Sequence, residues 1–181
     1  MISTLSTARG DVVLRPIGEA DAEAYREVRL EGLRLHPEAF GADYEATAAR
    51  PIEEWLERAR KGAAGDEGVT YVAEAAGQLL GMVALVRNAT VKTRHAATIY
   101  GVYVRPAWRG LGIADALLGA CVEHGRTIGL RLVRLGVATC NIAAVRVYAR
   151  CGFSVYGVEP ESIRVGDTYH DELLMARRLV P

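Results

Sequence analysis

Apolar positions along this chain recur with two different periods, which predict helices and strands in a mixed order. The helical period is clearest over 52–61, where four apolar residues share one face: Ile52, Trp55, Leu56 and Ala59. Acidic residues open that segment, basic residues close it and Gly62 follows, as the helix dipole and a helix end favour. A strict alternation over 133–137 predicts a half-buried strand.

The same patterns along the rest of the chain predict the order of the elements and so the fold class. We expect a strand at 12–17, helices at 19–35 and 51–61, strands at 69–74, 79–87 and 98–104, a helix at 111–130, a strand at 133–137, a helix at 141–151 and strands at 153–158 and 170–178. The order β-α-α-β-β-β-α-β-α-β-β predicts an α+β (mixed α/β) domain on a single mixed sheet. Residues 11–181 are expected to form one domain and residues 1–10 a flexible N-terminus.

Composition and charge exclude several classes of protein. Lys plus Arg and Asp plus Glu both number 22 among 181 residues, so the net charge is zero and no general nucleic-acid surface is expected. No apolar run approaches the ~20 residues of a membrane span, and the N-terminus lacks the pattern of a secretory signal. The cysteines, Cys121, Cys140 and Cys151, are far apart, which fits reduced thiols in the cytoplasm and no metal site.

The first chemical signal is the segment VRPAWRGLGIA, residues 104–114, where a strand passes through a glycine turn into a helix. A helix N-terminus carries backbone N–H groups without partners and a partial positive charge. No Ser, Thr, Asp or Asn stands at the cap, so a bound phosphate group would satisfy these donors. A tight turn with glycines for geometry alone is the alternative, while a P-loop and a dinucleotide fingerprint do not match.

The second signal is the segment NIAAVRVYARCGF, residues 141–153, which predicts a short helix. Asn141 and Tyr148 lie seven residues apart, about two turns, and so share nearly one face. Taken singly, Asn141 is typical of a helix cap and Tyr148 of a core aromatic residue.

Together and in this order, the two segments resemble the GNAT superfamily of acyl-CoA-dependent N-acetyltransferases. The first resembles the family's V-x-P-x-x-R-G-x-G-x-A signature, and the second its N-x-x-A-x-x-x-Y-x-x-x-G-F segment. The resemblance covers most of the chain from Val12 onward. It implies a GNAT-like fold and the transfer of an acetyl group from acetyl-CoA to a primary amine by direct attack in a ternary complex.

The resemblance also implies which residues bind acetyl-CoA. Backbone amides of the glycine turn would hold the pyrophosphate, and the preceding strand would pair with the pantetheine arm and polarise the thioester carbonyl. Tyr148 would donate a proton to the leaving thiolate, as the catalytic acid. The expected cofactor-binding residues are Val102, Tyr103, Val104, Arg109, Gly110, Leu111, Gly112, Ile113, Ala114, Asn141 and Tyr148.

The general base is not assigned by the sequence, because the strand TIYGVYV at 98–104 carries no acid where many family members have a glutamate. The candidates lie in three places: Glu38, Asp43 and Glu45 after the first helix, His95 before the strand, and His170, Asp171 and Glu172 near the last strand. An apolar run follows Asp171 and Glu172, so one of the two is expected to face inward; which one stays open.

The acceptor is expected to be a small-molecule or peptide amine. The loop at 37–46 combines aromatic and acidic residues, and the resemblance places the acceptor near it. Acids there would suit a cationic amine. The missing strand glutamate leaves an alternative function, a non-catalytic module that binds or senses acyl-CoA. Family members often form homodimers, so the resemblance also implies a homodimer.

Overall fold

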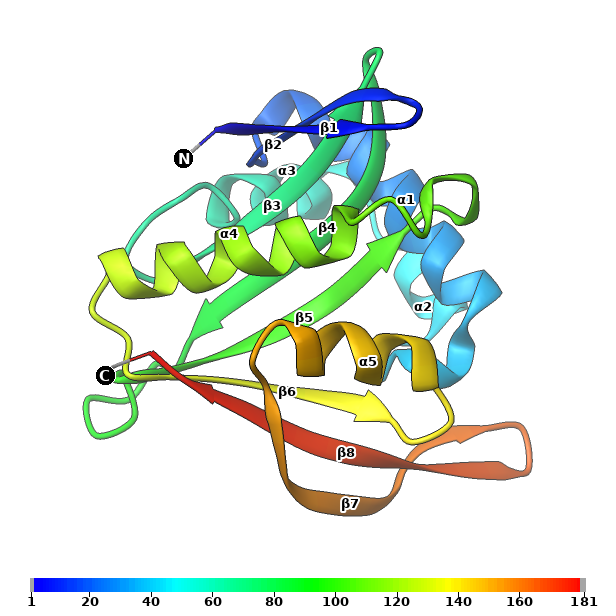
Figure 1. Cartoon of the computed structure of the whole chain (residues 1–181). Helices are drawn as coiled ribbons and strands as arrows, with labels where there is room; N and C mark the ends of the chain where they lie inside the picture. The colour runs from blue at the N-terminus through cyan, green and yellow to red at the C-terminus, as the bar shows by residue number, and fades with distance from the viewer. Residues whose placement is uncertain (1, 180–181) are drawn as a thin grey trace.

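One mixed sheet organises the chain, and a computed structural model describes residues 2–179 of it (Figure 1). The eight strands lie in the order β1-β2-β3-β4-β5-β6-β8-β7, and β5 and β6 are parallel whereas the other neighbours are antiparallel. The strands are β1 (Ser3–Thr7), β2 (Gly10–Pro16), β3 (Gly68–Ala75), β4 (Gln78–Arg87), β5 (Ala96–Val104), β6 (Leu132–Ala138), β7 (Ser154–Val165) and β8 (Thr168–Arg178).

The helices cover the two faces of this sheet (Figure 1). They are α1 (Ala22–Leu35), α2 (Tyr44–Ala48), α3 (Ile52–Lys61), α4 (Ile113–Thr127) and α5 (Ile142–Arg150). Side chains alternate across β3, so Tyr71 joins the core under α4 whereas Val72 joins the core under α1 and α3. Trp55 of α3 is 0% exposed at the centre of the second core. None of the described helices is long and apolar enough to cross a membrane.

The predicted fold class is confirmed, and two elements were missed. Where a flexible N-terminus is expected over 1–10, β1 pairs with β2 through a tight turn that Thr7 closes by donating its hydroxyl to the Gly10 carbonyl, 2.7 Å away. The short helix α2 begins in the loop where no element is expected, because the Asp43 carboxylate accepts a hydrogen bond from the Ala46 amide at 2.7 Å. The last two strands are longer than predicted and meet in a hairpin at 166–167.

The strands β5 and β6 separate in the middle of the sheet. They pair only from Ala96–Leu132 to Thr98–Arg134, and beyond that β6 pairs with β8 alone (Figure 1). A bulge in β5 accompanies the separation: Tyr100 pairs with Ala84 but Tyr103 with Met82, and Gly101 has a φ of +64°. The second half of β5 therefore exposes backbone groups along the edge that faces β6.

A charge network on the α1 side predicts pH-dependent stability. Arg15 of β2 donates to Asp21 at 2.7 Å and to Glu74 at 2.6 Å, and this bonding lowers the pKa of Asp21. A depressed carboxyl pKa stabilises the folded state above the unfolded pKa near 3.9. That contribution is lost as pH falls through the folded value. We expect Arg15→Met to lower the unfolding free energy by about 2 kcal/mol at pH 7 and by less at pH 3.

Urea unfolding at the two pH values measures this difference. Lys61→Met is the matched control, because Lys61 pairs with Glu57 on the exposed face of α3 at 3.3 Å. We expect the control to change stability by less than about 0.5 kcal/mol at either pH. An Arg15→Met deficit that is equally large at pH 3 would show that the network contributes through packing rather than through charge.

Candidate functional site

The turn between β5 and α4 presents a row of unpaired backbone donors. The N–H groups of Gly110, Leu111, Gly112, Ile113 and Ala114 have no hydrogen-bond partner among the described residues. The first amide of the helix to be bonded is that of Ala116, which donates to the Gly112 carbonyl at 3.0 Å. Gly112 is the cap residue and has no side chain to accept from the helix. The helix dipole and these donors together favour an anion at this point.

The two glycines of this turn have the backbone conformation that such a cradle needs. Gly110 and Gly112 have φ angles of +77° and +79°, which side chains with a Cβ rarely adopt. Apart from the adjoining residues, no described atom lies within 4 Å of the position that a Cβ would take on either glycine, so the approach to the amides is open. A phosphate group fits this donor set.

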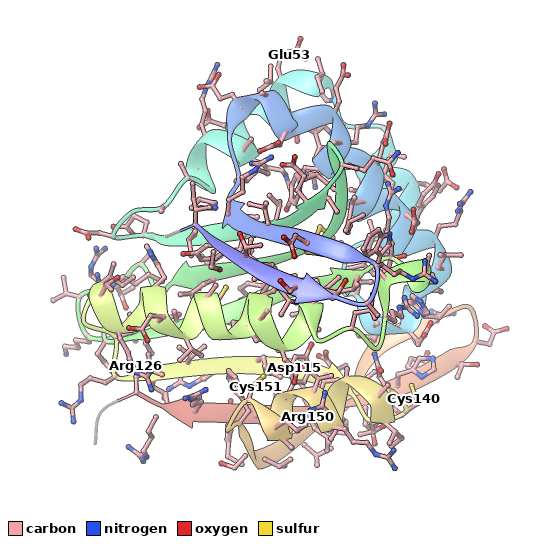
Figure 2. All side chains as sticks on the ribbon, turned by 45° about the horizontal axis from the view of Figure 1, so that its top comes forward. Glu53, Asp115, Arg126, Cys140, Arg150 and Cys151 are labelled. Carbon is pink, nitrogen blue, oxygen red and sulfur yellow. The ribbon has the colours of Figure 1, made fainter. Side chains whose placement is uncertain are left out.

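Asp115 in the first turn of α4 would oppose an anion there if its charge were free. Figure 2 shows its side chain beside Arg150 of α5, and the Arg150 Nε lies 3.1 Å from the Asp115 Oδ1. The pair also raises the pKa of Arg150, which stays cationic. Arg150 therefore screens the negative charge of Asp115 and ties α5 to α4 next to the glycine turn.

The strand residues Val102, Tyr103 and Val104 follow the bulge and border the gap between β5 and β6. Their backbone groups on that edge are not paired with β6. The Tyr103 side chain lies in the core under α1 rather than in the gap, and its hydroxyl donates to Glu31 at 2.8 Å. Burial and this bond raise the pKa of Tyr103 to about 12, so the phenol stays protonated near neutral pH.

Arg109 differs from the other residues predicted to bind the pyrophosphate, because its backbone amide already has a partner. Its own N–H is used within the turn, donating to the Pro106 carbonyl at 3.2 Å. Its side chain folds back over the end of β5, donating to the Val104 carbonyl and approaching the His36 ring nitrogen, both at 2.9 Å. Because a guanidinium only donates, that nitrogen of His36 accepts. Arg109 thus braces the turn and leaves the amides of the following residues to bind a ligand.

Asn141 and Tyr148 lie at the cap and within α5, beside the gap. The Asn141 side-chain oxygen accepts from the Ala144 amide at 3.1 Å, so this residue caps the helix, and its amide nitrogen remains a donor. Tyr148 is 7% exposed, and its ring packs edge-on against Phe153 at 6.3 Å. Burial raises the pKa of Tyr148, which therefore keeps its proton as a general acid must.

The residues considered as general base lie at different distances from the gap between β5 and β6. His95 precedes the end of β5 that pairs with β6, far along the strand from the open gap. Asp43 serves as a helix cap and Glu45 is exposed on α2. His170 lies 3.9 Å from the Cys140 sulfur, at the exposed end of β6 that Figure 2 marks by Cys140. Glu38 lies in a turn that contacts β6 and β7.

Glu172 is the inward-facing member of the pair left open by the sequence, whereas Asp171 is exposed. Its carboxylate accepts from the Ser162 hydroxyl at 2.7 Å and lies 3.1 Å from where a Cβ of Gly136 would be. Val137 and Leu135 of β6 join the core under α4 and α5, so Gly136 and Glu172 lie on the opposite face. That is the face which α1 covers further along the sheet.

Two charged residues of α1 escaped the sequence analysis. The Glu31 carboxylate accepts a hydrogen bond from the Tyr103 hydroxyl and lies 3.5 Å from the Arg105 Nε. Arg29 lies against the bulge of β5, with its Nη1 3.2 Å from where a Cβ of Gly101 would be. The signal for Arg29 was its spacing, four residues after Tyr25 and three before Gly32 in the apolar stripe. No group of three potential metal ligands is present among the described residues.

Comparison with known sequences adds a family match to this geometry. The model of the acetyltransferase (GNAT) family matches residues 15–153. A mycothiol acetyltransferase from Thermobispora bispora is 31% identical over 141 residues, which cover 77% of this chain and 45% of that enzyme. The chain thus spans less than half the length of each mycothiol acetyltransferase that it matches.

Comparison with solved structures shows the same fold. The acetyltransferase of the GNAT family from Streptococcus pneumoniae superposes with a TM-score of 0.83 at 23% identity, covering 92% of this chain and 99% of that one. A phosphinothricin acetyltransferase from Sinorhizobium meliloti, solved in complex with acetyl-CoA, has a TM-score of 0.79 at 19% identity and covers 92% and 88% of the two chains.

Proposed function

The chain belongs to the acetyltransferase (GNAT) family, and from that premise we propose that it transfers the acetyl group of acetyl-CoA to a primary amine. The observation that carries the proposal is the open glycine turn, whose unpaired amides stand beside a gap between two strands and a protonated Tyr148. Acetyl-CoA, the cosubstrate of this family, has a pyrophosphate for the turn and an extended amide-bearing arm for the free edge of β5.

Each part of the site has a role in the proposed binding of acetyl-CoA. The amides from Gly110 to Ala114 hold the pyrophosphate, and the edge of Val102 to Val104 pairs with the pantetheine arm. The side-chain amide of Asn141 donates to the same arm while its oxygen caps α5. Arg109 contributes through its side chain, which fixes the turn to the end of β5, rather than through its amide.

The reaction requires a neutral amine, an electrophilic carbonyl and a protonated leaving group. An amine with a pKa near 10.4 is neutral in only about one part in a few thousand at pH 7, so a base must remove its proton. The amine nitrogen then forms a bond to the thioester carbon, and a backbone amide at 102–104 stabilises the oxyanion. The C–S bond breaks, and Tyr148 gives its proton to the departing thiolate.

We assign the base to Glu172, because it faces the side from which α1 and the loop after it border the gap. Its carboxylate is half-buried and has a hydroxyl partner, Ser162, that a glutamine can keep. We expect Glu172→Gln to lower kcat/KM about 100-fold at pH 7, and by less as pH approaches the pKa of the amine. A pH profile of steady-state rates measures this.

Glu159→Gln is the matched control for this variant, since Glu159 faces Glu172 across the β7–β8 pair but is exposed. We expect the control to retain wild-type rates over the whole pH range. A Glu172→Gln variant with an unchanged profile would move the assignment to Glu38, the remaining carboxylate of the loop that contacts β6 and β7.

A small-molecule amine is the acceptor that the relatives support best. The names of related enzymes include mycothiol and L-methionine sulfoximine or L-methionine sulfone acetyltransferases. A peptide amine remains the alternative acceptor. The predicted homodimer also stays a prediction; the edge strand β7 carries exposed Val155, Tyr156 and Val158 that would suit it.

Release of free CoA thiol from acetyl-CoA, measured with and without a panel of amines, tests the proposed function. We expect release that depends on an amine and is accompanied by one equivalent of N-acetylated product. Tight acetyl-CoA binding without amine-dependent release from any acceptor would favour instead the acyl-CoA sensing module, which the absence of a carboxylate on β5 suggests.

A further inference from the structure

Arg29 is a half-buried cation that has no anionic partner in the described part of the chain, residues 2–179. It lies on α1, and its guanidinium stacks over the ring of Phe40 at 4.7 Å. Its Nη1 is fully enclosed and makes no hydrogen bond to any residue that the structure describes. Its other two nitrogens donate to no described residue either, and they are not fully enclosed. The N–H groups of Nε and Nη2 are therefore available to a ligand.

The electrostatic surroundings of Arg29 make this arrangement unfavourable in the empty protein. Desolvation by burial lowers the pKa of Arg29, and the nearby charge of Arg58 acts in the same direction. Among the described residues, the compensating neighbour is the phenol of Tyr25, which carries no charge near neutral pH. Removing a cation from water without pairing it costs several kcal/mol in general. An anion supplied from outside would offset that cost.

Three other half-buried arginines on the same side of the sheet have protein partners. Arg15 is held by Asp21 and Glu74, and Arg105 lies 3.5 Å from a Glu31 oxygen. Arg26, one turn before Arg29 on α1, donates to the Ala48 carbonyl at 2.9 Å. Arg29 therefore differs from these three half-buried arginines in having no hydrogen-bond or ion-pair partner among the described residues.

That position lies at the proposed reaction centre. Arg29 Nη1 reaches within 3.2 Å of where a Cβ of Gly101 would be, one residue before the β5 edge assigned to the pantetheine arm. Phe40 comes from the loop after α1, whose turn at Pro37–Ala39 contacts β6 and β7 on the other side of the gap. An amine that approaches β5 from the α1 side passes Arg29.

We propose that Arg29 binds a carboxylate of the acceptor, so that the acceptor is a small-molecule amine that carries a carboxylate, as an amino acid does. A guanidinium pairs with a carboxylate through two parallel hydrogen bonds, which position the substrate as well as hold it. The inference rests on the proposed function and narrows its acceptor class. It disfavours a polyamine as acceptor, because Arg29 and the nearby Arg58 would repel the second cationic group that a polyamine carries.

The test compares amines in pairs, the common L-amino acids against the amines left when each carboxylate is removed. For each compound, kcat/KM is measured in the wild type, in Arg29→Met and in Arg29→Lys. We expect Arg29→Met to reduce kcat/KM about 10- to 100-fold for the preferred amino acids and less than about threefold for their decarboxylated counterparts. Arg29→Lys keeps the positive charge but cannot form the two parallel hydrogen bonds, so its kcat/KM for amino acids should lie between those of the wild type and Arg29→Met. The ratio of variant to wild-type kcat/KM is taken for each compound separately. Differences in amine pKa between compounds therefore cancel.

Arg34→Met is the matched control, an exposed arginine on the same helix, and should leave both classes of substrate unaffected. Calorimetry of the same pairs with the CoA-saturated protein reports binding independently of turnover. Equal losses for both members of each pair, or no carboxylate binding more tightly than its counterpart, would overturn the inference. Failure of acetyl-CoA itself to bind would instead overturn the proposed function, so the two failures are distinguishable.

Discussion

A Gly112→Asp variant will lose measurable binding of acetyl-CoA while it keeps most of its stability. The new carboxylate would stand at the cap of α4, where the unpaired amides and the helix dipole favour an anion, and would occupy those donors itself. A charge about 4 Å from the pyrophosphate opposes it by roughly 4 kcal/mol at an effective dielectric of 20, or about 1,000-fold in affinity. Calorimetric titration with acetyl-CoA measures the loss.

Gly129→Asp is the matched control for this substitution. Gly129 follows the other end of α4 and has a φ of +74° against +79° for Gly112, and apart from adjoining residues no described atom lies within 4 Å of where its Cβ would be. The two variants share the same backbone strain, of about 1 kcal/mol, and differ only in where the charge stands. Near-normal acetyl-CoA affinity in Gly112→Asp would remove the pyrophosphate from this turn.

A Tyr148→Phe variant will bind acetyl-CoA with nearly wild-type affinity and turn it over about 100-fold more slowly. The substitution removes only the hydroxyl proposed as the proton donor to the thiolate, and general acids contribute typically 100- to 10,000-fold. The hydroxyl makes no hydrogen bond to a described residue, and the ring contact with Phe153 is retained, so stability should change little. Steady-state kcat and an acetyl-CoA titration separate the two effects.

Tyr156→Phe, on the exposed edge strand β7, is the control and should behave as wild type. An acid acting on the leaving group affects kcat rather than the binding of the amine. Turnover in Tyr148→Phe that equals wild-type turnover would therefore assign the thiolate's proton to another donor, with the rest of the site unchanged.

Much of the fold could be predicted from the sequence because its patterns are local. The helix expected over 51–61 forms with Pro51 as its cap and Ile52 as its first residue, and its end is as predicted, since its apolar face, its terminal charges and Gly62 all agree. The strands expected at 69–74 and 79–87 do pair, through a hairpin at 76–77 where both residues have positive φ. In contrast, β1 has a single apolar residue that packs on the core, Leu5, and only its partner β2 makes it a strand.

The local structure of the candidate site could be predicted where it depends on short motifs and not where it depends on pairing between distant strands. The glycine turn and Asn141 to Tyr148 each lie within one local segment. The separation of β5 from β6 depends on a register between strands far apart in sequence and on the bulge at Gly101. The choice between Asp171 and Glu172 could not be made, because the three apolar residues that follow give no alternation from which to read the phase.

Thermal unfolding with and without acetyl-CoA tests most directly the central claim, that the glycine turn and the edge of β5 bind this cosubstrate. At about 100 times Kd the ligand should add about 2.7 kcal/mol. For a chain of this size that raises Tm by about 5 to 10 °C. The predicted result is this rise with acetyl-CoA and none with ATP or NADH. No rise with acetyl-CoA or with longer acyl-CoAs would contradict both the enzyme and the sensor.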